Sequence, residues 1–225
     1  MIDKFFETFG GKEKIQETVK NLSKNFTDKD IVKFIQDNKI SYSVMDAKKM
    51  DAMVEGRHQG IIVVVDEYEY VDYKTMLNDK IVVMLDHLED PHNFGAIIRT
   101  CEAAGIKSII IPKDRSVSVT STVMKTSAGA LEHVNISMVN NLVNVINDFK
   151  DNGYFVYAAD MDGRNYKQVS YADKVLLIIG SEGNGLGRLV KKNCDEILSI
   201  PQFGHVNSLN ASVAAAILIY GIVNK

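Results

Sequence analysis

The chain has 225 residues, of which 46% are hydrophobic and 24% charged, a composition typical of a globular protein with a sizeable core. The formal net charge of -3 excludes a strongly basic nucleic-acid-binding chain, and no apolar run approaches the roughly 20 residues that span a bilayer. The two cysteines, Cys101 and Cys194, lie far apart and argue against a disulfide framework, so we expect a cytoplasmic protein without membrane association.

The first 67 residues predict a small α/β domain. Its expected helices and strands are, in chain order, the helices Lys12–Leu22 and Asp28–Asn38, the strand Ile40–Val44, the helix Ala47–Val54 and the strand Gly60–Val65. The polar, tyrosine-rich stretch Asp66–Asp79 follows, and we assign residues 68–79 as a linker.

From Lys80 to the end of the chain, apolar strand-like runs alternate with helical segments. The expected strands are Ile81–Leu85, Ser108–Pro112, Val134–Val139, Tyr154–Ala159, Val175–Gly180 and Glu196–Ile200. Continuous apolar strands are typical of a parallel sheet covered on both faces, so residues 80–225 predict a doubly wound α/β domain. Asn93 and Gly105 are expected to cap the helix between them, and Asn141–Asn152 predicts a helix that ends at Gly153.

Gly, Asn, Ser and isolated charged residues gather in the segments Leu85–Gly105, Ile179–Leu186 and Ile200–Ala216. Each segment begins at the carboxyl end of an expected strand. Because the carboxyl ends of parallel strands share one edge of a sheet, and ligands bind at that edge, the segments predict one composite site.

Several familiar sites are disfavoured. Gly183, Gly185 and Gly187 form GxGxG and not the GxGxxG dinucleotide fingerprint, which weakens the reading as a nicotinamide-dependent oxidoreductase. His87 and His92 lack an evident third ligand for a metal ion. Cys101 is expected in the core, and Cys194 has no visible base that would make it a nucleophile.

Each polar residue in these segments also has a purely structural interpretation. Arg99 lies among apolar neighbours on its helix, either as a solvated surface residue or as an anion ligand. Glu182 would complement a helix dipole, and Ser208 and Asn210 would cap the final helix. Their shared order and shared sheet edge favour a joint function.

The stretches DPHNFGAIIRTCEAAG, GSEGNGL and IPQFGHVNSLNASVAAAI resemble the three motifs of the SpoU (TrmH-like) RNA ribose 2′-O-methyltransferases, and the resemblance covers residues 80–225. GRHQGIIVVV, from Gly56 to Val65, is similar to the end of the small RNA-binding, ribosomal-protein-like domain of one subgroup, which methylates a guanosine ribose in 23S ribosomal RNA. Met1–Lys24 departs from that subgroup, because it lacks the opening strand and the YGxxxVxEAL-like helix.

The resemblance implies a fold, a donor and a set of site residues. The fold would be a parallel sheet whose C-terminal part forms a trefoil knot, in a homodimer that uses the apolar helix Leu209–Val223. The methyl donor would be S-adenosylmethionine, without a metal. Catalytic positions would be Asn93, Arg99, Glu182, Ser208 and Asn210, and donor contacts Gly180, Glu182, Gly183, Ile200, Ser208 and Leu209.

In this interpretation Arg99 would clamp an RNA phosphate and stabilise the developing alkoxide, since a guanidinium is hard to deprotonate. The acceptor is expected to be 23S ribosomal RNA; transfer RNA and a noncatalytic RNA-binding role are the alternatives. Six basic residues have two interpretations: they line a groove that contacts RNA phosphates, or they are scattered solvated charges. They are Arg57, Arg99, Arg115, Lys125, Arg164 and Arg188.

Overall fold

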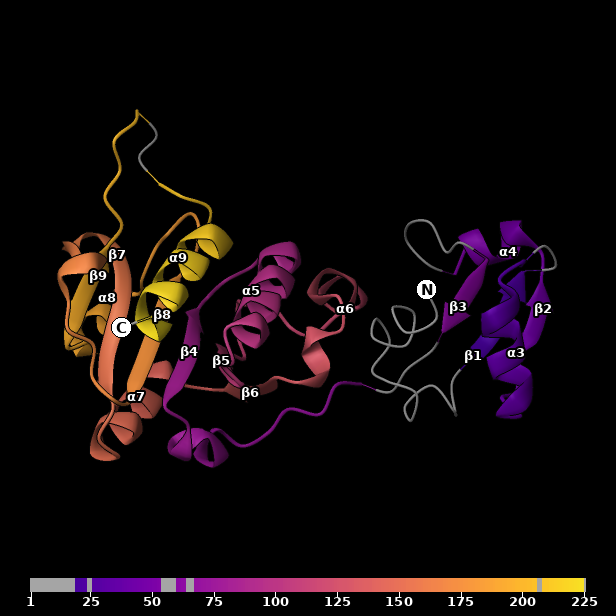
Figure 1. Ribbon diagram of the computed structural model, residues 1–225, viewed down its shortest axis with the longest axis horizontal. Helices are drawn as coiled ribbons and strands as arrows, with labels where there is room; N and C mark the ends of the chain where they lie inside the picture. The colour runs from indigo at the N-terminus through magenta and orange to yellow at the C-terminus, as the bar shows by residue number, and fades with distance from the viewer. Residues whose placement is uncertain (1–18, 24–25, 54–59, 64–66, 206–207, 225) are drawn as a thin grey trace. The chain divides into compact units, whose positions relative to one another are not determined.

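A computed structural model describes residues 19–23, 26–53, 60–63, 67–205 and 208–224 (Figure 1). The chain divides into two compact units, Met1–Tyr68 and Glu69–Lys225. Of the expected elements, the first part of Lys12–Leu22 and the ends of Ala47–Val54 and Gly60–Val65 lie outside the described residues. No helix in the described ranges is both long enough and apolar enough to cross a bilayer.

The first unit contains a small mixed sheet with the strand order β2-β1-β3. β1 (Val19–Ser23) runs parallel to β2 (Ser43–Met45) and antiparallel to β3 (Ile61–Val63). The helices are α3 (Lys29–Asp37), which Asp28 caps as expected, and α4 (Ala47–Asp51). Ile31, Ile35 and Ile40 form the buried cluster of this unit.

The predicted helix Lys12–Leu22 is wrong over its described part. Residues 19–22 belong to β1, the central strand, which pairs with a neighbour on each side. Asn21 and Leu22 pair with both neighbouring strands, and Val19 pairs with β3, so pairing between strands outweighs the helical spacing of the apolar residues in the sequence.

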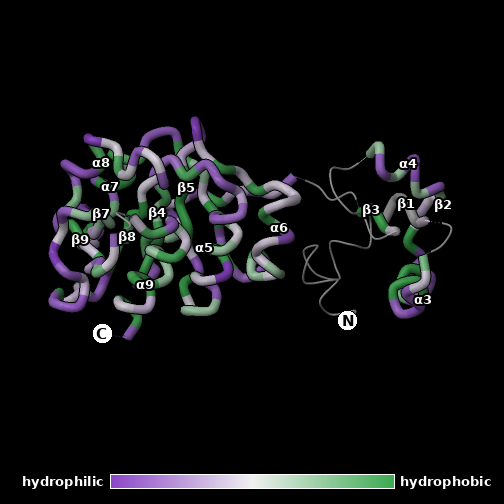
Figure 2. Tube along the Cα trace, turned by 90° about the horizontal axis from the view of Figure 1, so that it is seen from above, coloured by the Kyte–Doolittle hydropathy of each residue, from purple (hydrophilic) through white to green (hydrophobic). Residues whose placement is uncertain are grey.

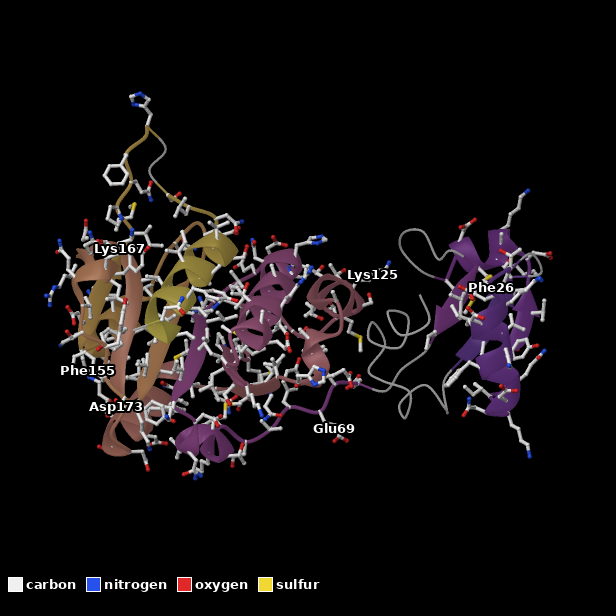
Figure 3. All side chains as sticks on the ribbon, viewed as in Figure 1. Phe26, Glu69, Lys125, Phe155, Lys167 and Asp173 are labelled. Atoms are coloured by element: carbon white, nitrogen blue, oxygen red, sulfur yellow. The ribbon has the colours of Figure 1, made fainter. Side chains whose placement is uncertain are left out.

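The second unit is built on a six-stranded parallel sheet with the order β6-β5-β4-β8-β7-β9. The strands are β4 (Ile81–Asp86), β5 (Ser108–Pro112), β6 (Asn135–Val139), β7 (Phe155–Asn165), β8 (Val175–Gly180) and β9 (Glu196–Ser199). β5 is buried throughout and β8 nearly so, as their unbroken apolar sequences predict, and Figure 2 shows hydrophobic colour through the central strands.

Helices cover both faces of this sheet. They are α5 (Pro91–Ala103), α6 (Ser121–Ser127), α7 (Leu142–Asp151), α8 (Arg188–Asn193) and α9 (Ala211–Val223). α7 and α8 lie on one face, whereas α5 and α9 lie on the other (Figures 1 and 2). α5 contacts both α6 and α9, and a Cβ at Gly95 of α5 would come within 2.6 Å of the Cβ of Thr126, so the helices α5 and α6 are very close there.

Two predicted helix starts need correction. Asp90, not Asn93, caps α5, because Pro91 occupies the first helical position, where its missing N–H costs nothing. The final helix begins at Ala211 and not at Leu209, since Asn210 is its cap. The helix ends are confirmed: Gly105 and Gly153 follow α5 and α7 with φ of 76° and 84°.

The predicted strand Tyr154–Ala159 is too short. β7 continues to Asn165, but Ala159 and Arg164 both pair with Leu198 of β9. The residues between them, 160–163, therefore form a bulge. The bulge could not be predicted, because the run of polar residues and a glycine after Ala159 is also typical of a loop.

The segment after Tyr68 packs against the second unit. The N–H of Val71 donates to the carbonyl of Ile136 at 3.0 Å, and the Tyr73 hydroxyl, in the 3-10 helix η1 (Tyr73–Asn78), donates to Asp148 at 2.5 Å. The Tyr154 hydroxyl donates to the carbonyl of Met76 at 3.0 Å. Residues 71–76 are therefore attached to the unit that contains the six-stranded sheet.

Candidate active site

A cavity of about 610 Å³ lies where β7, β8 and β9 end. Its walls come from the bulge of β7, the loop after β8, α8, the segment after β9 and α9. It is lined by every residue that the sequence predicts to contact a donor: Gly180, Glu182, Gly183, Ile200, Ser208 and Leu209. Apolar side chains, among them Ile179, Leu198 and Leu218, line it together with four charged ones.

Glu182 connects the helices α5 and α9. Its Oε1 accepts hydrogen bonds from the side-chain amide of Asn93 in the first turn of α5 and, at 3.1 Å, from that of Asn210. Asn93 also donates to Asp90 at 2.8 Å, and the Asn210 oxygen caps α9 by accepting from the N–H of Ser212 at 3.0 Å. One carboxylate therefore joins segments that are far apart in the sequence.

The loop after β8 turns sharply. Ser181 and Gly185 exchange two backbone hydrogen bonds of 3.1 and 3.0 Å, and Gly185 has a φ of 63°. A Cβ at Gly180 would lie 2.5 Å from the carbonyl carbon of Gly185, so only glycine allows the loop to fold back over the end of the strand.

Asp86, which holds the loop beside the cavity, is a residue that the sequence analysis did not single out. Its side chain is fully buried at the end of β4, beside Gly180 in the parallel register. Its carboxylate accepts from the N–H of Gly187 at 2.6 Å and lies 2.6 Å from Nδ1 of His87, which has a φ of 55°. The sequence feature that could have identified Asp86 is a carboxylate at the end of an apolar strand, the edge of the sheet where ligands bind.

The structure does not bring Arg99 to the cavity. Arg99 is exposed on α5, and no residue in the described ranges forms a hydrogen bond or ion pair with its side chain. It follows Asn93 by six residues, which places it about 240° around the helix from the side chain that reaches Glu182. The structure thus groups Asn93, Glu182 and Asn210, and leaves Arg99 on a separate, solvated face.

Comparison with known protein families covers both units. Residues 80–220 match the SpoU rRNA Methylase family, and residues 12–71 match a family described as RNA 2′-O ribose methyltransferase substrate binding. The chain belongs to the SpoU rRNA methylase family. It is therefore an RNA methyltransferase of the SpoU (TrmH-related) class.

Relatives and solved structures agree with the SpoU assignment. A putative TrmH family tRNA/rRNA methyltransferase of Staphylococcus saprophyticus is 41% identical over 219 residues, which are 94% of this chain and 86% of that protein. A putative TrmH-family RNA methyltransferase of Porphyromonas gingivalis superposes with a TM-score of 0.70 at 26% identity, over 90% of this chain and 81% of that one. The SpoU methyltransferase AviRb from Streptomyces viridochromogenes, solved with AdoMet, shares the fold with a TM-score of 0.79 at 21% identity, over 93% and 84%.

Other chemistry has little support in this SpoU-family protein. Burial raises the pKa of the Cys101 thiol, and burial, with the charges of Asp195 and Asp86, raises that of Cys194 to about 12, so both thiols stay protonated near neutral pH. His87 and His92 face different partners, Asp86 and Thr126. Within the described ranges, no three His, Cys, Asp or Glu side chains gather as metal ligands.

Proposed function

We propose that this chain transfers a methyl group from S-adenosylmethionine to a ribose 2′-hydroxyl of RNA, and that the acceptor is a guanosine in 23S ribosomal RNA. The observation that carries the proposal is the Glu182 bridge. It joins Asn93 of the first motif and Asn210 of the third beside the cavity that the second and third motifs line. Residues that the family motifs share are thus assembled around one space.

The cavity fits a donor of this kind. About 610 Å³ is within the range of roughly 300–1,000 Å³ in which small-molecule ligands bind. Gly180, Gly183, Ile200 and Leu209 would hold the donor through backbone groups and apolar contacts, with Glu182 and Ser208 at its polar side. The bound donor supplies a methyl group on a sulfonium, which needs no metal.

The chain's own residues would position the acceptor. Asn93, Glu182 and Asn210 fix the loop after β8 against the first turns of α5 and α9, so the cavity wall is ordered before RNA binds. Arg99, exposed and without a described partner, is free to bind the RNA phosphate beside the reacting ribose. Because Arg99 lies outside the cavity, its guanidinium would act through this phosphate contact, and it would remain protonated.

A homodimer is part of the proposal. Val213, Tyr220 and Val223 of α9 are 46%, 43% and 37% exposed, although the helix is apolar on nearly all sides. Their spacing places them along one side of the helix, and an apolar stripe of this kind favours a protein partner. The trefoil knot, the cytoplasmic location and the assignment of residues 1–67 as the RNA-binding domain are proposed on the family resemblance.

The acceptor is tested by supplying the purified chain with radiolabelled S-adenosylmethionine and RNA from cells that lack it. We expect label in 23S ribosomal RNA and none in transfer RNA. Label in transfer RNA alone would establish the alternative acceptor, since the Staphylococcus relative is named as a tRNA/rRNA methyltransferase. Absence of label in either RNA, with the donor bound, would support the noncatalytic alternative.

A further inference from the structure

The bulge in β7 places an acidic side chain in the cavity wall. Because Ala159 and Arg164 both pair with Leu198, residues 160–163 leave the regular strand, and Asp160 becomes a cavity residue. Gly163 permits the bulge, since a Cβ there would lie 2.6 Å from the backbone of Ile197. Bulges often redirect a side chain beside a functional site.

Asp160 forms an ion pair with a residue of α8. Its Oδ2 lies 2.6 Å from Nζ of Lys191, and the two side chains are 22% and 38% exposed. Burial acts to raise the pKa of Asp160, but the hydrogen bond and charge of Lys191 outweigh it, so the pKa lies below its usual value. Asp160 is therefore ionised at neutral pH and held in place at the cavity wall.

A second cation lines the same cavity. Arg188, the first residue of α8, is exposed, and no side chain in the described part of the chain pairs with it. Glu182, the other acidic residue of the wall, already accepts from two amides. Asp160, Arg188 and Lys191 therefore offer one carboxylate and two cationic groups on neighbouring elements.

This set of charges is complementary to an α-amino acid group, which carries an ammonium and a carboxylate on one carbon. A carboxylate accepts from the ammonium, and a guanidinium binds a carboxylate through two parallel hydrogen bonds. The remaining wall, with Ile179, Leu198 and Leu218, suits a flat apolar group such as a purine. The two kinds of wall match the two ends of the proposed donor.

We propose that Asp160, Arg188 and Lys191 form the subsite for the amino-acid end of the methyl donor. Asp160 accepts hydrogen bonds from the ammonium group, and Arg188 and Lys191 bind the carboxylate. This inference rests on the proposed function. The ion pair between Asp160 and Lys191 holds both side chains near their binding positions in advance, which lowers the cost of ordering them.

The test compares two ligands that differ in this end alone. S-adenosylhomocysteine carries the amino acid group, and 5′-methylthioadenosine lacks it. Their affinities are measured by calorimetry for the wild type and for Asp160→Asn, Arg188→Met and Lys191→Met. Arg164→Met is the matched control, because Arg164 pairs with Glu196 and does not line the cavity. Thermal unfolding of each variant verifies that it is folded.

We expect each subsite variant to lower the affinity for S-adenosylhomocysteine by about tenfold, as for loss of one charge-assisted hydrogen bond. The affinity for methylthioadenosine should fall by less than about twofold. The control should change neither affinity. Equal losses for both ligands, or no loss for either, in folded variants would overturn the subsite while leaving the proposed function intact. A wild-type chain that binds neither ligand would contradict the proposed function itself, and the subsite with it.

Discussion

The N–H of Gly187 donates a 2.6 Å hydrogen bond to the buried carboxylate of Asp86, and this contact joins the end of β4 to the start of α8. It holds the far end of the loop whose near end begins at Gly180. A buried carboxylate is costly unless it is paired, and here the backbone of that loop and the ring of His87 satisfy it.

Asp86→Asn should destabilise the second unit by about 2 kcal/mol, because hydrogen bonds to a charged acceptor are worth more than neutral ones. His87→Gly should cost less than about 1 kcal/mol, since relief of the left-handed backbone at position 87 offsets the lost contact. Urea unfolding measures both, with the exposed Asp114→Asn as control. Equal losses at positions 86 and 87 would show that the histidine, and not the loop N–H, is the main partner of the carboxylate.

Glu182 and Asn210 should be energetically coupled. In a double-mutant cycle with Glu182→Ala and Asn210→Ala, we expect a coupling energy of about 1 kcal/mol in unfolding, from the hydrogen bond of 3.1 Å. Both single variants should also weaken donor binding, since they release the cavity wall. Asn147→Ala, on the exposed side of α7, is the control. Strictly additive effects would mean that the contact contributes nothing.

Alkaline pH should weaken the attachment of η1 to the second unit. The hydrogen bond to Asp148, together with burial and the charges of Asp148 and Asp72, raises the pKa of Tyr73 from 10.0 to about 12. The folded state thus keeps a proton that the unfolded state loses. The stability from this contact is complete below pH 10 and is lost as the pH rises towards 12.

Urea midpoints between pH 8 and 12 would measure this loss, and Tyr73→Phe should flatten part of the decline. Tyr166→Phe removes a hydroxyl without a described partner and is the control. An unchanged pH profile in Tyr73→Phe would contradict the assignment.

Arg99→Ala should abolish methyl transfer and leave donor affinity within about twofold of wild type, because Arg99 is exposed and outside the cavity. Stability should change by less than about 0.5 kcal/mol, as for other exposed positions. Arg99→Lys keeps the charge without the bidentate geometry and should restore only part of the activity. Collapse of donor binding in Arg99→Ala would instead make Arg99 a structural residue.

The sequence predicted the six-stranded core well because its strands are uninterrupted apolar runs, and Ser108–Pro112 and Val175–Gly180 match β5 and β8 residue for residue. β1 was mistaken for a helix because its pairing partners are distant in sequence. Asn93 has the side chain of a cap, but the preceding Asp90 and Pro91 begin the helix and leave Asn93 free to reach Glu182.

The site was predicted as a set of strand-end segments, and the structure adds the contacts between them. The Asn93–Glu182 contact spans 89 residues, and the Asp86–Gly187 contact spans 101, so no local pattern indicates either. The bulge that exposes Asp160 to the cavity depends on the register of β7 against β9, which composition does not encode.

The position of the transferred methyl group tests the central claim most directly. Ribosomal RNA labelled by the purified chain is hydrolysed in alkali, which cleaves next to every free ribose 2′-hydroxyl but not next to a methylated one. We predict that the label is recovered in one alkali-resistant dinucleotide that begins with guanosine. Label recovered in mononucleotides would place the methyl group on a base and contradict ribose methylation by this chain.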